Sequence, residues 1–478
     1  MLFNSFSFAM FLPIVFGLYW FLFKDKTKAQ NVLLLVASYY FYSCWDYRFL
    51  FLLIFSTFLD YFTGLKISNS TSQYHKKIWL FISLFVNFGF LAIFKYYDFF
   101  VSSFIELLSN FGVNASYVPL NIILPVGISF YTFHGISYVF DIYKGRIEDE
   151  KNIVDYSLFV SFFPLLVAGP IERATHLLPQ IKFKREFNYN KLVDGLRQML
   201  WGFFKKIVIA DNCAEYANEI FGNHSSFDGT TLIFGAILFS VQIYCDFSGY
   251  SDIALGVARL FGIELLRNFA FPYFSRDIAE FWRRWHISLS SWFKDYLYIP
   301  LGGSKGNMLR KVRNTFIIFI VSGFWHGANW TFVIWGLLNA LYILPLIIFN
   351  LNRNNLEIVS KNKILPNISD FFKILLTFSL TVFAWIFFRS ENVSYAFSYI
   401  TKIFTSTHLL LPEIFPKYLI LLIIFMFGIE WIARENKYGL EKIGLNWPWF
   451  LRYSFYYLII LLIIFNAGEE QEFIYFQF

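Results

Sequence analysis

Two histidines, His286 and His326, lie in strongly apolar and aromatic stretches of this chain of 478 residues. Burying an imidazole in hydrocarbon without a hydrogen-bonding partner costs roughly 2 to 7 kcal/mol, depending on the reference state. An ionisable residue at membrane depth is therefore a functional-site candidate. A neutral imidazole, with an unperturbed pKa of about 6.5, can take a proton from a hydroxyl and return it to a leaving group. Acyl transfer from a thioester to an alcohol requires this chemistry.

The second histidine, His326, lies in the sequence SGFWHGANW, where Gly323 and Gly327 reduce the bulk of the helix beside the ring. Small neighbours allow another group to approach the imidazole closely. The alternative is a structural histidine with a satisfied hydrogen bond, and spacing alone leaves both interpretations open. Trp325 and Asn329 flank this position and are candidate substrate contacts.

Around His286, aromatic and charged residues are interleaved from Ser275 to Gly303 instead of forming separate faces. This pattern is typical of helices that lie at a membrane interface or enter the bilayer partway. Arg283 and Arg284 are interpreted as snorkelling or headgroup-binding residues. The alternative is that they bind an anionic donor such as a pantetheine phosphate.

The most polar membrane-associated stretch begins at Gln242 and contains Asp246 and Ser248 in what is otherwise an ordinary span. Gly249 is expected to loosen the helix between the polar residues. One interpretation is a kinked helix that packs through small residues and hydrogen bonds. The other is that Asp246 and Ser248 belong to the polar wall of a substrate cavity.

The elements that position these residues are predicted to be membrane helices. The chain is 57% hydrophobic, 23% aromatic and 15% charged, and its 65 phenylalanines exceed what soluble cores would bury. Crossing a bilayer takes about 20 apolar residues. Runs approaching this length recur along the chain: Phe8 to Phe23, Phe49 to Leu65, Ile78 to Phe94, Ile122 to Ile142, Thr315 to Thr331 and Tyr418 to Ile432. We predict an all-α polytopic membrane protein.

Loop charges support this prediction. Lys and Arg are concentrated in alternate loops, which are expected to face the cytoplasm. The first apolar run, Phe8 to Phe23, is expected to be a retained helix and not a secretory signal. We therefore interpret the net charge of +7 as a consequence of the basic cytoplasmic loops and not as a sign of nucleic-acid binding. Counting alternations predicts about eleven or twelve transmembrane or re-entrant segments in a single domain, 1–478. Interruptions are expected near Pro164 to Pro170 and around Gly249.

Other motifs exclude several classes of site. The three cysteines are widely spaced and form no CxxC pair, and no HExxH or Cys/His cluster is present, so no metal site is predicted. No GxSxG elbow or Walker A sequence is present either. His134, in FYTFHGISY, is a further intramembrane candidate, whereas His176 is predicted to lie in a cytoplasmic-side loop.

Several long motifs resemble the membrane-bound O-acyltransferase family, and more narrowly its bacterial alginate O-acetylation branch. They are FWRRWHISLSSWFKDYLYIPLGG at Phe281 to Gly303, SGFWHGANW at Ser322 to Trp330, AGPIER at Ala168 to Arg173, YCDFSGYSDIA at Tyr244 to Ala254, WIFFRSEN at Trp385 to Asn392, the opening MLFNSFSFAMFLPIVFGLYW and the ending FIYFQF. The resemblance covers essentially the whole chain.

The resemblance implies a ring of tilted helices around a thin central region pierced by a tunnel. The donor would enter this tunnel from the cytoplasm and the acceptor from outside. By similarity, His326 matches the family's catalytic histidine and His286 matches a second, more variable polar position. His326 would then be the base, and His286 would position or polarise the donor carbonyl. No bound cofactor is implied, and acyl-CoA, in particular acetyl-CoA, is the expected co-substrate.

The resemblance also implies partners and a location. The protein would lie in the lipid bilayer of a bacterial inner membrane and serve an extracytoplasmic polysaccharide such as alginate or another exopolysaccharide. The immediate acceptor could instead be a periplasmic SGNH-type acetyltransferase similar to AlgJ or AlgX. The alternatives are peptidoglycan O-acetylation, a transporter of acyl groups or small anions, and a non-catalytic scaffold. A transporter is disfavoured because no inverted repeat of broken helices is visible.

Overall fold

The computed structural model describes residues 1–113, 115–120, 122–406, 411–468 and 473. Within these ranges the chain forms helices and connecting segments and no strands, which confirms the predicted all-α class. It divides into two compact units, which are described separately: Met1–Leu192 with Val257–Leu266, and Val193–Gly256 with Arg267–Phe478. The single domain 1–478 stays a prediction.

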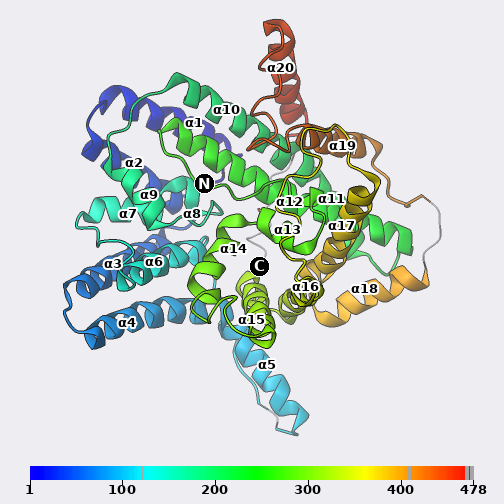
Figure 1. Ribbon diagram of the computed structural model, residues 1–478, viewed down its shortest axis with the longest axis horizontal. Coiled ribbons are helices and arrows are strands. Elements are labelled where there is room, and N and C mark those ends of the chain that lie inside the picture. The colour runs from blue at the N-terminus through cyan, green and yellow to red at the C-terminus, as the bar shows by residue number, and fades with distance from the viewer. Residues whose placement is uncertain (114, 121, 407–410, 469–472, 474–478) are drawn as a thin grey trace. The chain divides into compact units, whose positions relative to one another are not determined.

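In the first unit, α3 packs against α4 and α6, and α2 packs against α7 (Figure 1). Asp60 of α3 accepts hydrogen bonds from Ser83 Oγ at 2.7 Å and Asn87 Nδ2 at 2.9 Å, both from α4. The helices are α1 Phe6–Gly17, α2 Thr27–Ser43, α3 Tyr47–Asn69, α4 Gln73–Leu91, α5 Tyr97–Asn110, α6 Ile128–Tyr143, α7 Ile153–Ser161, α8 Phe163–Leu166 and α9 Ala174–Lys182.

The second unit contains most of α10 and α12 and all later helices, and its most extensive helix pair is α15 with α16 (Figure 1). The helices are α10 Tyr189–Phe203, α11 Asp211–Gly222, α12 Gly229–Leu260, α13 Ile278–Arg284, α14 Ile287–Phe293, α15 Met308–His326, α16 Trp330–Ile348, α17 Ile368–Arg389, α18 Val393–Thr405, α19 Lys417–Ile432 and α20 Trp449–Phe465. Across both units, the described residues include four π-helical segments that extend or join helices: Leu18–Leu22, Ala92–Tyr96, Phe204–Ala210 and Lys294–Tyr298.

In the described part of the chain, five helical stretches are long and apolar enough to cross a membrane. They are Tyr47–Asn69, Gln73–Asn110, Gly229–Leu260, Trp330–Ile348 and Ile368–Arg389, and the shorter apolar stretches are Phe6–Leu22 and Trp449–Phe465. These helices agree with a polytopic membrane protein. The count of eleven or twelve segments stays a prediction.

The predicted interruption around Gly249 is wrong, because α12 is continuous from Gly229 to Leu260. The glycine instead allows a close backbone contact. A Cβ at this position would lie 2.8 Å from the carbonyl oxygen of Gly202 and 3.1 Å from the amide nitrogen of Lys206. Gly249 therefore marks a close contact between helices and not a break in α12.

The apolar run predicted from Thr315 to Thr331 also differs from the structure, since α15 ends at His326 and α16 begins at Trp330. Asn329 causes the new start, because its side chain accepts a hydrogen bond from the backbone N–H of Thr331 and caps α16. The run is therefore the end of one helix and the start of the next, with His326 at the turn.

The break expected between Pro164 and Pro170 is confirmed, since α8 ends at Leu166 and α9 begins only after the AGPIER sequence. Glu172 of this sequence donates its backbone N–H to His134 Nε2 at 2.9 Å. Its carboxylate contacts His176 Nδ1 at 2.8 Å, and His176 lies in α9 and not in the predicted loop. In the C-terminal motif FIYFQF, Phe473 is described and buried, whereas residues 474–478 lie outside the described residues.

Candidate functional site

His326 lies at the C-terminal end of α15, where it is 4% exposed. Three aromatic rings surround it edge-on: Trp325 at 4.9 Å between ring centroids, Trp335 of α16 at 5.1 Å and Phe388 of α17 at 5.4 Å. The C-terminal end of a helix carries a partial negative charge, which stabilises a cation placed there. The end of α15 therefore places partial negative charge beside the ring of His326.

Glycines bring α16 against the end of α15. A Cβ at Gly323 would lie 2.2 Å from the carbonyl oxygen of Phe332, and a Cβ at Gly327 would lie 2.1 Å from the Phe332 ring. These glycines thus allow close approach of α16 to the end of α15, while the approach of a substrate group to the imidazole stays a prediction. The group that approaches is the backbone and one ring of α16.

His286 precedes α14 and adopts a left-handed backbone conformation, with φ 42° and ψ 56°. This conformation is uncommon for a residue other than glycine and indicates a constrained position. The imidazole is 1% exposed, and its Nδ1 lies 2.9 Å from Asn268 Oδ1. Phe247 contacts the ring edge-on at 4.6 Å.

Trp325 connects the two histidines. Its ring centroid lies 4.9 Å from that of His326 and 6.3 Å from that of His286, both in edge-on geometry. The fold therefore brings these three predicted site residues into one aromatic cluster, although 40 positions separate the two histidines in the sequence.

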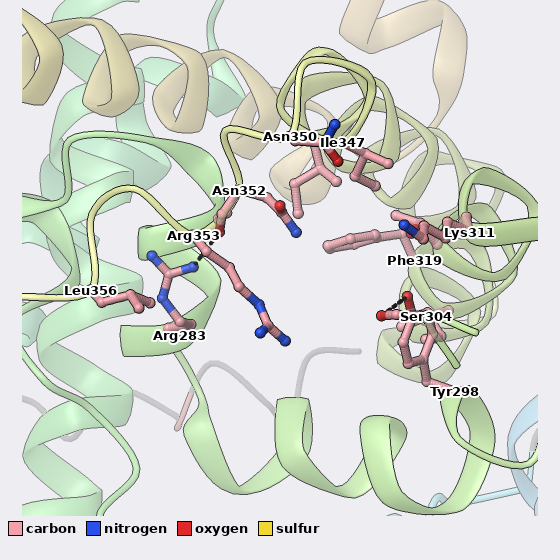
Figure 2. Close-up of a pocket in the computed structure, with 14 residues that line it drawn as sticks. Arg283, Tyr298, Ser304, Lys311, Phe319, Ile347, Asn350, Asn352, Arg353 and Leu356 are labelled. Carbon is pink, nitrogen blue, oxygen red and sulfur yellow. Dashed lines mark hydrogen bonds between the residues drawn. The ribbon is translucent and has the colours of Figure 1, made fainter. Parts of the chain in front are cut away.

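Arg283 lines a cavity of about 800 Å³ (Figure 2). Its guanidinium donates to the carbonyl oxygens of Asn352 at 3.0 Å and Asn355 at 2.8 Å. Arg353 reaches into the same cavity, and Lys311 lies on its far side in Figure 2. None of the 14 described residues that line the cavity is acidic. The cavity is therefore suited to an anionic ligand.

Helix α15 contributes residues to this cavity and ends at His326. Lys311, Thr315 and Phe319 line the cavity at spacings of four residues, and His326 follows Phe319 by seven residues on the same face. At 1.5 Å per residue, the helix rises roughly 22 Å from Lys311 to His326.

Arg284 has a different environment from Arg283. Its guanidinium pairs with the buried Glu280 carboxylate at 2.7 Å and donates to the carbonyl oxygen of Ala270 at 3.2 Å. Arg276 pairs with the same carboxylate at 3.0 Å. The charge of Arg284 is thus balanced within the fold, and its role in donor binding stays a prediction.

Asp246 and Ser248 of α12 belong to a buried network of lysines. Asp246 pairs with Lys206 at 2.8 Å, and Ser248 accepts a hydrogen bond from Lys205 at 2.9 Å. Lys205 also pairs with Asp252 at 2.6 Å. The free space beside this network is about 10 Å³, near the lower limit for one water molecule. The structure thus gives both residues partners within the protein, and substrate binding by them stays a prediction.

Asn329 caps α16 and also donates its side-chain N–H to the carbonyl oxygen of Glu391 at 2.6 Å. This contact connects the turn after His326 to the segment between α17 and α18. The geometry gives Asn329 a structural role in holding that turn.

The sequence reasoning missed the cavity residues Lys311 and Arg353, the network residues Lys205 and Lys206, and Asn268. The adjacent lysines in FFKKIV, within an otherwise apolar stretch, were a usable signal for buried ion pairs. Asn268 carried no signal, because it meets His286 through the fold and not through sequence spacing.

The chain is similar to known membrane acyltransferases. Residues 146–390 match the membrane-bound O-acyltransferase family. The probable alginate O-acetylase AlgI of Pseudomonas aeruginosa is 38% identical over 82% of this chain and 72% of its own length. The peptidoglycan O-acetyltransferase of Helicobacter pylori is 38% identical over 83% of this chain and 78% of its own length. The teichoic acid D-alanyltransferase of Bacillus subtilis is 31% identical over 47% of this chain and 59% of its own length.

The region matched to the family contains both histidines, Trp325 and every residue that lines the cationic cavity. Together with the apolar helices, these matches show that the chain is a multi-pass membrane acyltransferase that belongs to the membrane-bound O-acyltransferase family.

Proposed function

We propose that this protein transfers an acetyl group from acetyl-CoA on the cytoplasmic side to a hydroxyl on the outer side of a bacterial inner membrane. The observation that carries the proposal is the cationic cavity, which is lined in part by α15, the helix that ends at His326. A donor with phosphates at one end and a thioester at the other fits a site with cations at one end and a base at the other.

Three cations would bind the donor phosphates. Arg283 is held by two loop carbonyls, while Arg353 and Lys311 extend into the cavity (Figure 2). Phosphate oxygens accept strong charge-assisted hydrogen bonds from guanidinium and ammonium groups. The apolar wall beyond them, which includes Phe319 and Ile318, suits the thin arm that carries the thioester.

His326 would act as the base. Its imidazole takes the proton of the attacking hydroxyl while the hydroxyl oxygen forms a bond to the thioester carbonyl carbon. When the tetrahedral intermediate collapses, the C–S bond breaks, and the thiolate of CoA receives the proton from His326. The products are an ester and free CoA thiol. The surrounding aromatic rings exclude water and so protect the thioester from hydrolysis.

The acceptor we favour is an extracytoplasmic polysaccharide of the alginate type, reached directly or through the serine of a periplasmic SGNH-type acetyltransferase. The relatives support this class, because they are named as acyltransferases of alginate, peptidoglycan and teichoic acid. The 38% identity to both the alginate and the peptidoglycan enzymes keeps peptidoglycan as the second candidate acceptor.

The test compares cells that produce the native protein, His326→Ala or His75→Ala at equal membrane levels. His75 is an exposed histidine of α4 and serves as the matched control. Mass spectrometry of secreted and envelope glycans should show acetyl groups lost in His326→Ala and retained in His75→Ala. Unchanged acetyl content in His326→Ala would reject catalysis and favour the transporter or the scaffold. The glycan that loses acetyl groups identifies the acceptor.

A further inference from the structure

Asn268 lies at the centre of a buried hydrogen-bonded cluster that includes His286. Its Oδ1 atom is 2.9 Å from His286 Nδ1 and 2.9 Å from Ser288 Oγ, and its Nδ2 donates to Ser251 Oγ at 3.2 Å. Its own backbone carbonyl accepts a hydrogen bond from Ile287 N–H at 2.9 Å. All four clustered side chains belong to residues that are 4% exposed or less. The amide is therefore fixed from several directions.

A backbone N–H group determines which way the side-chain amide of Asn268 is turned. The backbone N–H of Ser288 points at the side-chain Oδ1 at 3.4 Å. A backbone N–H can only donate, so the atom that faces it must be the oxygen. Since Oδ1 only accepts, the hydrogen bond at 2.9 Å requires His286 Nδ1 to carry the proton.

The proton at Nδ1 determines what the other ring nitrogen can do. A neutral imidazole has one N–H, so Nε2 of His286 then holds a lone pair and accepts hydrogen bonds. The neutral form is favoured because the rings of Phe247, Phe269 and Trp325 surround the imidazole, where an imidazolium would lose its hydration.

We propose that Asn268 is a positioning residue that holds His286 as its Nδ1–H tautomer, so that Nε2 accepts a hydrogen bond from the alcohol substrate. This proposal rests on the acyl transfer proposed above. It differs from the role that the family resemblance implied, in which His286 polarises the donor carbonyl. A carbonyl oxygen needs a hydrogen-bond donor, and Nε2 in this tautomer is an acceptor. His286 thus orients the alcohol, while His326 takes the proton from the attacking hydroxyl.

The first test reads the tautomer directly, without any activity measurement. Protein labelled with ¹⁵N-histidine is reconstituted in lipid and examined by solid-state NMR, and the His286 signals are identified by their loss in His286→Gln. We expect a protonated Nδ1 and an unprotonated Nε2 in the native protein. A protonated Nε2 with a bare Nδ1 would overturn the proposal, whether or not the protein transfers acetyl groups.

The second test separates the two substrates kinetically in nanodiscs with acetyl-CoA and a soluble polysaccharide. Asn268→Leu removes the oxygen, Asn268→Asp keeps an oxygen acceptor, and Ser251→Ala removes only the partner of Nδ2. We expect Asn268→Leu to lower kcat/KM for the polysaccharide about 10-fold, the effect of one buried hydrogen bond, while KM for acetyl-CoA and its slow hydrolysis stay unchanged. Asn268→Asp should retain most of the transfer, and Ser251→Ala should resemble the native enzyme.

Two kinetic outcomes would contradict the proposal. An equal loss of acetyl-CoA hydrolysis and transfer in Asn268→Leu would indicate that His286 acts on the donor carbonyl. Native transfer rates in Asn268→Leu would show that the tautomer does not matter. If Asn268→Leu does not accumulate in the membrane, the proposal is tested by the NMR measurement of the His286 tautomer in the native protein. A native-like His326→Ala would instead reject the proposed function and leave the tautomer result valid.

Discussion

Gly323 of α15 and Gly336 of α16 face each other so closely that a Cβ on Gly323 would lie 3.3 Å from the Cα of Gly336. The added carbon would also meet a backbone carbonyl of the opposite helix, at 2.2 Å for Gly323 and 2.3 Å for Gly336. A backbone oxygen cannot move aside as a flexible side chain can. The contact therefore sets the distance between the two helices three residues before His326.

Replacement of Gly323 or Gly336 by alanine should destabilise the protein and reduce acyl transfer. The added methyl group must separate α15 from α16, at a typical cost of about 1 to 3 kcal/mol for overpacking. Thermal unfolding in detergent and acetyl transfer at saturating donor would measure both effects. Gly428→Ala in α19 is the matched control, because nothing lies within 4 Å of its added carbon. Equal stability of all three variants would refute the importance of this helix contact.

Charge reversal in the cavity should weaken donor binding selectively. Arg353→Glu or Lys311→Glu places a carboxylate among the proposed phosphate-binding groups. We expect KM for acetyl-CoA to rise at least roughly 10-fold with little change in kcat, because one charge-assisted contact contributes about 1.5 to 3 kcal/mol. Lys305→Glu, an exposed loop residue that does not line the cavity, should have native kinetics. Should KM stay unchanged in both cavity variants, the donor phosphates bind elsewhere.

Replacement of Lys206 by methionine should prevent the protein from folding stably. The change leaves two carboxylates, Asp211 and Asp246, without a cation that now lies 2.8 Å from each. Removing one partner from a buried ion pair costs about 3 to 5 kcal/mol. The yield of monodisperse protein after detergent extraction measures the loss. Lys184→Met, which removes an exposed ion pair with Asp25, should leave the yield unchanged, and a similar yield for both variants would contradict this prediction.

The stability of the first unit should depend on pH through His176. The hydrogen bond to the Glu172 carboxylate is the largest influence and raises the pKa of His176 above its usual 6.5. Because the folded state binds this proton more tightly than the unfolded chain, the stabilisation is fully present below about pH 6.5 and is lost as the pH rises through the higher folded value.

Thermal unfolding of the native protein and of His176→Gln, measured from about pH 6 to about pH 9, would test this dependence. The difference between the two unfolding temperatures should shrink as the pH rises. His75→Gln, a change in an exposed histidine, should leave the native pH profile unaltered. A constant difference between the native protein and His176→Gln across the range would exclude the linkage.

The helical class and the two histidines could be predicted from sequence because both signals are local. Apolar runs of membrane length indicate helices, and an imidazole among aromatic residues is conspicuous wherever it occurs. The helix end at His326 was missed because Trp325 and Trp330 on either side continue the apolar pattern through the turn.

Partners distant in sequence could not be predicted. In the sequence, Asp246 and Ser248 resemble polar cavity residues. In the fold they contact Lys206 and Lys205, which lie about 40 positions earlier in the chain. Asn268 reaches His286 across 18 positions, and Lys311 meets Arg353 at one cavity across 42. Such encounters depend on how the helices are arranged in three dimensions, and a pattern in one dimension does not contain that information.

The buried pairs between Lys205 or Lys206 and the acids of α12 also bear on how the chain enters the bilayer. Asp246 and Asp252 lie within a candidate spanning helix, where each charge at the centre of a bilayer raises the insertion cost by about 2.5 to 3.5 kcal/mol. Both lysines emerge from the ribosome before these acids do. The cations are thus already present when the translocon receives α12, and they can neutralise the two acids as the helix partitions into lipid.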